Sequence, residues 1–169
     1  QQPEETNMAL EQLYKIVNEQ ITHELGAEMQ YLAISFWLER ENLQGMAAWF
    51  KQQAIEEHDH AMKIVGLMNE WDAPIALISP PNPTLEFESL TSVFEAALAH
   101  EQRVTEQINS IFKTAREESA WHIEVAFQWF VTEQVEEEVN ARDNLAKIIM
   151  IGDNPAALLE FDRHLATPA

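Results

Sequence analysis

The sequence predicts an all-α protein, a bundle of four long helices with one long crossover connection and a short fifth helix near the C-terminus. Three observations predict this fold. Apolar residues recur every seven positions through four long segments, as on the buried face of packed helices. Residues 72–88 interrupt the pattern and contain four of the seven prolines. A last short segment opens with Asn154-Pro155, a helix-start signal, and has an apolar edge of its own.

The first predicted helix runs from Met8 to about Arg40. Val17 and Leu38 lie on its apolar stripe, a whole number of heptads apart. Residues 1–7 are polar and contain a proline, so we expect them to form a flexible N-terminus. Residues 8–169 are long enough to form one domain with its own core.

The second predicted helix runs from Leu43 to Trp71, with Phe50 and Ile64 on its inner stripe. The turn at Glu41–Asn42 is short, so this helix should return antiparallel to the first. The proline-rich segment that follows is too long for a tight turn. A crossover along the bundle would explain its length and would let the third helix run parallel to the second.

The remaining long helices are delimited by polar caps and a glycine. Ser89 or Ser92 can cap the third helix, which should end near residue 117. Ser119 is then the expected cap of the fourth helix, from about Ala120 to Met150, and Gly152 should end it.

The predicted fifth helix has an apolar edge formed by Leu158, Phe161 and Leu165. A short helix of this kind cannot bury such an edge by itself. We therefore expect the edge to need a partner beyond the four-helix core, which favours assembly of several subunits.

Composition narrows the range of partners. The net charge is −19, which disfavours nucleic acid and anionic membrane surfaces. The chain has no Cys, so disulfides, zinc ribbons and thiolate chemistry are excluded. No apolar run reaches the length of a membrane span. An acidic chain suits cations, although solubility alone would also explain the charge.

Each of the four apolar stripes is interrupted near its middle by polar side chains that should face inward. These are Glu24, Glu57 with His60, Glu101, and Gln134 with Glu137. At similar depth in one bundle, their negative charges would repel one another strongly in a medium of low dielectric constant unless cations were bound. Oxygen ligands with a single imidazole suit iron or manganese, and zinc can also bind. The pattern therefore predicts a dinuclear, carboxylate-rich metal site.

The clearest local signal is Glu57-x-x-His60. Residues at i and i+3 project from the same side of a helix, and this pair is a known way to hold a transition metal from one helix. By itself the motif is common on solvated faces. The motif indicates a metal site only in combination with the other inward-facing carboxylates.

Four segments resemble the non-haem ferritins of the bacterial type. They are Asn18-Glu19-Gln20 with Glu24 and Tyr31, then Glu56-Glu57-x-x-His60, then His100-Glu101-Gln102, and last Gln128–Glu137. The resemblance extends from Met8 to Leu165. It implies the ferritin-like four-helix fold and a hollow homo-oligomer of 24 subunits. It also implies ferroxidase activity, in which Fe(II) is oxidised with O2 or H2O2 and stored as a ferric mineral.

The resemblance further implies three iron positions. The first would be held by Glu24, Glu57 and His60. The second would share Glu57 and take Glu101, with Gln134 and Glu137 close by. A third, on the cavity side, maps to Glu56, Glu133, Glu136 and Glu137. Tyr31 would lie beside the pair of irons, so that Tyr31, Glu57, Glu101 and Gln134 form the catalytic set.

The sequence departs from bacterioferritins at two places. Their second Glu-x-x-His is replaced by Gln134-x-x-Glu137, and His58 stands where they have a haem-ligating Met. We therefore expect no haem. Resemblance to bacterial proteins also implies a cytoplasmic location, if the source is bacterial, with an organellar location left open.

Several polar residues near these motifs are interpreted as surface residues: His58, Asp59, His100 and His122. Glu124 could line an iron-entry channel by family alignment, but Phe127 replaces the acid expected one turn later.

Two other functions remain open at this point. One is a di-iron oxidase or oxygenase that acts on an organic substrate, which would need a substrate pocket. The other is a structural shell protein with an inactive centre, against which the intact ligand set argues.

Overall fold

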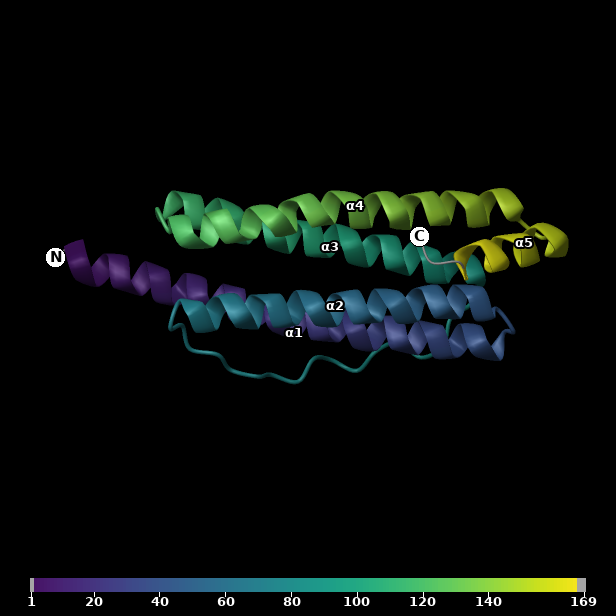
Figure 1. Ribbon diagram of the computed structural model, residues 1–169, viewed down its shortest axis with the longest axis horizontal. Coiled ribbons are helices and arrows are strands. Elements are labelled where there is room, and N and C mark those ends of the chain that lie inside the picture. Colours follow the sequence, from purple (N-terminus) through teal and green to yellow (C-terminus); the bar gives the residue numbers. More distant parts are fainter. Residues whose placement is uncertain (1, 167–169) are drawn as a thin grey trace.

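The computed structural model describes residues 2–166, which form five helices and, within that range, no strand. Four long helices lie side by side and a short one closes one end of the bundle (Figure 1). They are α1 (Gln2–Arg40), α2 (Gln44–Glu70), α3 (Leu90–Glu117), α4 (Trp121–Ile151) and α5 (Pro155–Leu165). The predicted fold class is confirmed, and α1 begins at Gln2 instead of Met8. None of these helices is long and apolar enough to cross a membrane.

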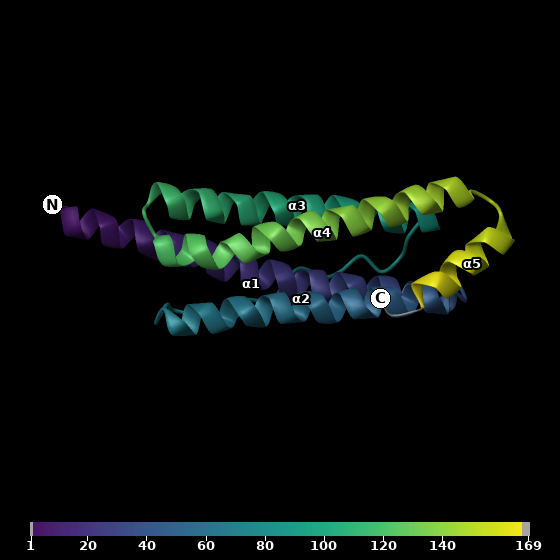
Figure 2. The same ribbon diagram turned by 45° about the horizontal axis from the view of Figure 1, so that its top comes forward.

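Two helical hairpins make up the bundle. α1 and α2 form one, joined at Glu41–Asn42, where Asn42 has a φ of 60°. α3 and α4 form the other. Residues 71–89 connect the hairpins by running along the whole bundle beside α1, so α3 is parallel to α2 as predicted (Figures 1 and 2).

The crossover has no regular secondary structure, yet two side-chain amides of α1 bind its backbone. Asn18 accepts from the amide of Ala76 and donates to its carbonyl, both at 2.9 Å. Gln30 forms the same paired contact with Thr84, at 2.8 and 3.0 Å. Each pair imitates two backbone hydrogen bonds of a β-ladder, so the connection is fixed at two points.

The helix caps agree with the sequence except at α4. Ser89 caps α3 by accepting from the amide of Ser92, whose own side chain accepts from Ser89 in return. Ser119 was predicted to cap α4, and this is wrong. Ser119 has a φ of 57°, in the left-handed region, whereas an N-cap residue needs extended backbone. Ala120 occupies the cap position, without a side-chain bond.

The hydrophobic core consists of two clusters with a polar layer between them. One is centred on Leu13, Ile64 and Phe127, and the other on Leu38, Phe50 and Phe94. Along α1 the chain passes from Ile21 in the first cluster to Tyr31 in the second, and the buried Glu24 lies between them. Apolar packing on both sides thus holds the polar layer at mid-length in the bundle.

α5 crosses from the end of α4 to the start of α2 (Figure 2). Its Phe161 is buried in the second cluster, and Leu158 and Leu165 pack against that cluster. The apolar edge therefore packs on the chain's own bundle, but Leu158 and Leu165 stay partly exposed. That the edge needs a partner beyond the four-helix core stays a prediction.

The docking of α5 also completes α2. Leu43, the N-cap residue of α2, has no side-chain hydrogen bond. Instead Asp162 of α5 accepts from the amide of Met46 at 2.8 Å, which satisfies one free amide and places a negative charge at the helix N-terminus. The approach is close, because a Cβ on Gly45 would lie 1.8 Å from the carbonyl oxygen of Asp162.

Gly45→Ala should therefore displace α5 and lower the free energy of unfolding by about 1–3 kcal/mol. Gly66→Ala is the matched control on the same helix, because an added Cβ there meets nothing within 4 Å. It should stabilise by about 0.5–1 kcal/mol. Denaturation of both apo-proteins would test this, and equal shifts of the same sign would contradict the close contact.

Candidate metal centre

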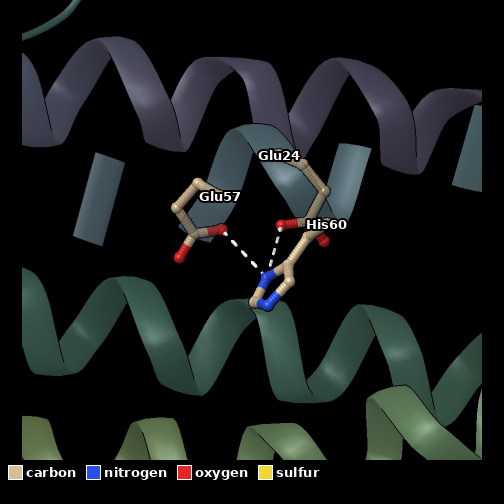
Figure 3. Close-up of side chains that lie close together, drawn as sticks. All are labelled: Glu24, Glu57 and His60. Atoms are coloured by element: carbon tan, nitrogen blue, oxygen red, sulfur yellow. Dashed lines mark ion pairs between the residues drawn. The ribbon is translucent and has the colours of Figure 1, made fainter. Parts of the chain in front are cut away.

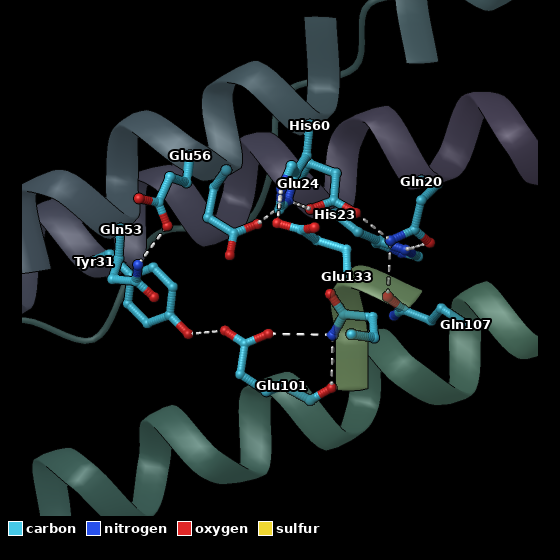
Figure 4. Close-up of polar contacts among 12 residues, drawn as sticks. Gln20, His23, Glu24, Tyr31, Gln53, Glu56, His60, Glu101, Gln107 and Glu133 are labelled. Carbon is cyan, nitrogen blue, oxygen red and sulfur yellow. Dashed lines mark hydrogen bonds and ion pairs between the residues drawn. The ribbon is translucent and has the colours of Figure 1, made fainter. Parts of the chain in front are cut away.

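The inward-facing polar residues predicted from the four stripes meet in the middle of the bundle. Glu24 comes from α1, Glu57 and His60 from α2, Glu101 from α3, and Gln134 and Glu137 from α4. All six are buried, with exposed fractions between 1% and 6%. Figure 4 shows that side chains of both hairpins point into this shared space. The prediction that these six side chains face inward is confirmed.

Glu24, Glu57 and His60 form the tightest group (Figure 3). The Nδ1 atom of His60 lies 3.6 Å from Glu57 and 3.9 Å from Glu24. One ligand atom from each residue lies within 4.8 Å of the others. The Oε2 atoms of both carboxylates are buried without a hydrogen-bond partner. Buried oxygens left unpaired in this way fit a cation placed between the three residues.

Electrostatics supports the same interpretation. Burial raises the pKa of Glu24 and of Glu57 well above the usual range, and each is raised further by a neighbouring carboxylate. Burial, then Glu101 and Glu56, raise the pKa of Glu137 to about 8. A raised pKa favours the protonated carboxyl, and a metal ion would have to displace that proton. Metal binding here should therefore release protons.

Glu101 is oriented by two donors. The hydroxyl of Tyr31 donates to its Oε1, and the side-chain amide of Gln134 donates to its Oε2 at 3.2 Å. Gln134 also donates to the backbone carbonyl of Glu101 at 3.2 Å. These bonds moderate the pKa of Glu101, which burial still raises. Gln134 was predicted as a metal ligand, and the structure places its amide nitrogen against Glu101, where it positions that carboxylate.

Glu24 has a comparable donor in Gln20. The amide of Gln20 donates to Glu24 Oε1 at 2.8 Å, while its own oxygen faces His23 at 3.3 Å. The role of Gln20 was not predicted. The signal available was its spacing, since residues at i and i+4 on one helix are neighbours.

The residues predicted for a third iron are only partly brought together. Glu133 and Glu137 lie close to His60, with Glu133 3.7 Å from its Nε2 atom. Glu56 is close enough to raise the pKa of Glu137, and it accepts from Gln52 and Gln53 at 3.1 and 2.5 Å. Glu136 is exposed and belongs to none of the ligand groups formed by residues 2–166.

His100 was interpreted as a surface residue, but it is half-buried. Its ring packs edge-on against Tyr31, with centroids 5.5 Å apart, and its Nε2 atom is buried without a partner. Burial, then Arg103 and His23, lower its pKa to about 4. It also forms a ligand group with Glu57 and Glu101. Heptad periodicity could not show this, because His100 stands one residue, or about 100°, off the stripe.

The other residues assigned to the surface are exposed. His58 lies 3.1 Å from Glu28, His122 contacts the hydroxyl of Tyr14, and Asp59 is also exposed. Glu124 accepts two hydrogen bonds from Arg116, at 2.7 and 2.9 Å. A carboxylate paired in this way is less available to a passing cation, which weakens its assignment to a channel.

Comparison with known proteins agrees with this geometry. A family description of the ferritin-like domain matches residues 14–151. The bacterial non-heme ferritin of Campylobacter jejuni is 35% identical, over 94% of this chain and 95% of that protein. That of Staphylococcus aureus is 31% identical, over 95% and 96%.

Solved structures give the same result. The open pore ferritin of the archaeon Archaeoglobus fulgidus superposes with a TM-score of 0.92 at 31% identity, over 94% of this chain and 98% of that one. The resemblance predicted from the motifs is confirmed, and this chain belongs to the ferritin family.

Proposed function

We propose that the protein is an iron-storage ferritin that oxidises Fe(II) at a dinuclear centre inside each subunit. Iron is the substrate and cargo of this reaction. The observation that supports the proposal most is the pair of ligand groups that share Glu57: one is completed by Glu24 and His60, and the other contains Glu101. A shared carboxylate between two such groups is what two neighbouring metal ions need as a bridge.

The charges of the centre also suit two Fe(II) ions. Four buried carboxylates, Glu24, Glu57, Glu101 and Glu137, carry four negative charges when ionised. Two Fe(II) ions balance them. Oxidation of both ions adds two positive charges that these residues do not balance, which favours release of the ferric product toward other anionic groups. The two electrons, together with two protons from solvent, reduce O2 to H2O2, or H2O2 to two molecules of water.

The protein's own residues have separate tasks in this scheme. Glu24, Glu57 and His60 bind the first iron, and Glu57 and Glu101 bind the second. Gln20 and Gln134 hold Glu24 and Glu101 by donating to one oxygen of each. Tyr31 donates to Glu101 and can supply a further electron or proton when the oxidant needs more than two irons provide.

The hollow shell of 24 subunits is part of the proposal. Its support within the subunit is an exposed apolar surface between α1 and the crossover, around a cavity of about 460 Å³. Phe36 is 56% exposed there and Leu85 is 62% exposed. Contact with another protein molecule is one way in which apolar surface of this kind becomes buried. We propose that a neighbouring subunit covers it.

An oxidase for organic substrates is less well supported. Such an enzyme needs a cavity of several hundred Å³ beside its metals. Among the described residues, the cavities of about 460 and 390 Å³ are lined by none of the six buried residues of the centre. A cytoplasmic location remains a prediction.

Glu57→Ala should abolish the fast oxidation of Fe(II), because both metal positions lose their shared ligand. His60→Ala should weaken the first position more than the second. Oxidation would be followed by stopped-flow absorbance after O2 addition, on particles whose mass is first checked by sedimentation to be near 24 times 19.4 kDa. Asp59→Ala, exposed on the same helix, is the control. Unchanged initial rates in both variants, or a stable monomer, would contradict the proposal.

Tyr31→Phe should preserve assembly and the binding of two irons, because the ring still packs against Phe50 and His100. Turnover after the first oxidation should slow, since the hydroxyl on Glu101 is gone. Tyr14→Phe is the matched control, because its hydroxyl contacts His122 at an exposed position. Identical multi-turnover time courses for parent and Tyr31→Phe would reduce Tyr31 to a packing residue.

The stability of the metal-free protein should fall as pH rises. A buried carboxyl whose folded pKa is raised stabilises the fold below its unfolded pKa, roughly 4–5, and loses that contribution as pH rises through the folded value, about 8 for Glu137. Glu137→Gln should flatten the profile between these limits. Zinc should also flatten it by neutralising the site. Denaturation across this range measures the slope, and a parent profile that rises toward pH 8 would contradict the buried carboxyl pairs.

A further inference from the structure

Glu57 is common to two ligand groups of the same composition. One contains Glu24 and His60, and the other contains Glu101 and His100. Each group therefore has two carboxylates and one imidazole. We propose that His100 is the imidazole ligand of the second metal position, so that both positions are Glu–Glu–His sites joined through Glu57. The proposal rests on the dinuclear centre proposed above and specifies its second half.

Distance and burial support a ligand role for His100. One of its ring nitrogens lies within 4.8 Å of the ligand oxygens of both Glu57 and Glu101. Two ligands on one ion at metal–ligand distances near 2.1 Å are separated by at most about 4.2 Å, so a small movement of the side chains closes the site. The buried Nε2 atom has no hydrogen-bond partner, which costs free energy unless another group fills that role.

Neighbouring contacts hold the ring while leaving it room to adjust. Tyr31 touches His100 edge-on and also donates to Glu101, so one side chain orients both proposed ligands. On its other side, His100 lines a cavity of about 240 Å³ between α1, the crossover and α3. A ring that lines a cavity has space in which to turn toward a metal.

An imidazole ligand changes which metal ions the second position should bind most tightly. A site of two carboxylates alone suits hard ions, whereas an added imidazole raises the affinity for zinc, copper and iron. It also explains how the second metal can be held while Gln134 presents its amide nitrogen to Glu101 and not to the ion.

Zinc is a suitable probe because it has no redox chemistry, so binding is measured apart from oxidation. Crystals of the assembled protein would be soaked with zinc and located by anomalous diffraction, and calorimetry would give the affinities. We expect two zinc ions per subunit, the second with a ring nitrogen of His100 at about 2.1 Å. His100→Phe keeps a ring against Tyr31 and should weaken the second zinc by at least about tenfold, leaving the first unchanged.

His58→Phe is the matched control. His58 follows Glu57 directly, as His100 precedes Glu101 directly, but its ring is exposed and pairs with Glu28. This variant should keep both affinities. If His100→Phe failed to fold, the zinc-soaked parent would still decide the question.

The outcomes distinguish the ligand role of His100 from the existence of the dinuclear centre itself. Zinc at the first position only, or a second zinc without a His100 nitrogen bound to it, would overturn the assignment of His100. Zinc at neither position would overturn the dinuclear centre as well.

Discussion

The confinement of several carboxylates to one small, dry volume is the constraint on which the rest of the structure depends. Glu24, Glu57, Glu101 and Glu137 come from four different helices, and all are almost wholly buried. Like charges at this depth repel strongly, and single charges there are poorly solvated. Protons retained on some of these carboxyl groups would relieve the repulsion in the metal-free protein. Burial and neighbouring carboxylates raise the pKa of Glu24, Glu57 and Glu137, which favours their protonated forms.

Apolar packing and hydrogen-bond donors together hold the buried carboxylates in place. The two hydrophobic clusters lie on either side of the polar layer and prevent the helices from separating to relieve repulsion. Hydrogen-bond donors are distributed unevenly among the oxygens of these carboxylates. Glu24 and Glu101 each receive a hydrogen bond from a buried amide, but Glu24 and Glu57 each keep one buried oxygen without a hydrogen-bond partner. Glu24 and Glu101 are thus oriented by protein donors, and the unpaired oxygens of Glu24 and Glu57 are left for a cation.

The helices and the inner face of each one could be predicted from the sequence. Both follow from local periodicity, which is why the buried positions of Glu24, Glu57 and Glu101 could be predicted. The role of a residue could not be predicted where that role depends on contacts between segments that are far apart in the sequence. His100 lies off the stripe and is half-buried beside a cavity that α1, the crossover and α3 line together. Likewise Asp162 serves α2 from a position 116 residues away, which no local pattern records.

Because Asp162 caps α2 from α5, the start of α2 cannot be completed until α5 has been synthesised. The second helix lacks a capping side chain of its own and obtains one from Asp162, close to the end of the described chain. A nascent chain that has not yet made α5 therefore has an incomplete start of α2 and leaves the apolar surface that receives Phe161 uncovered. All four long helices are synthesised before α5 can dock, so the start of α2 is the part of the bundle that is completed after the other long helices have been made.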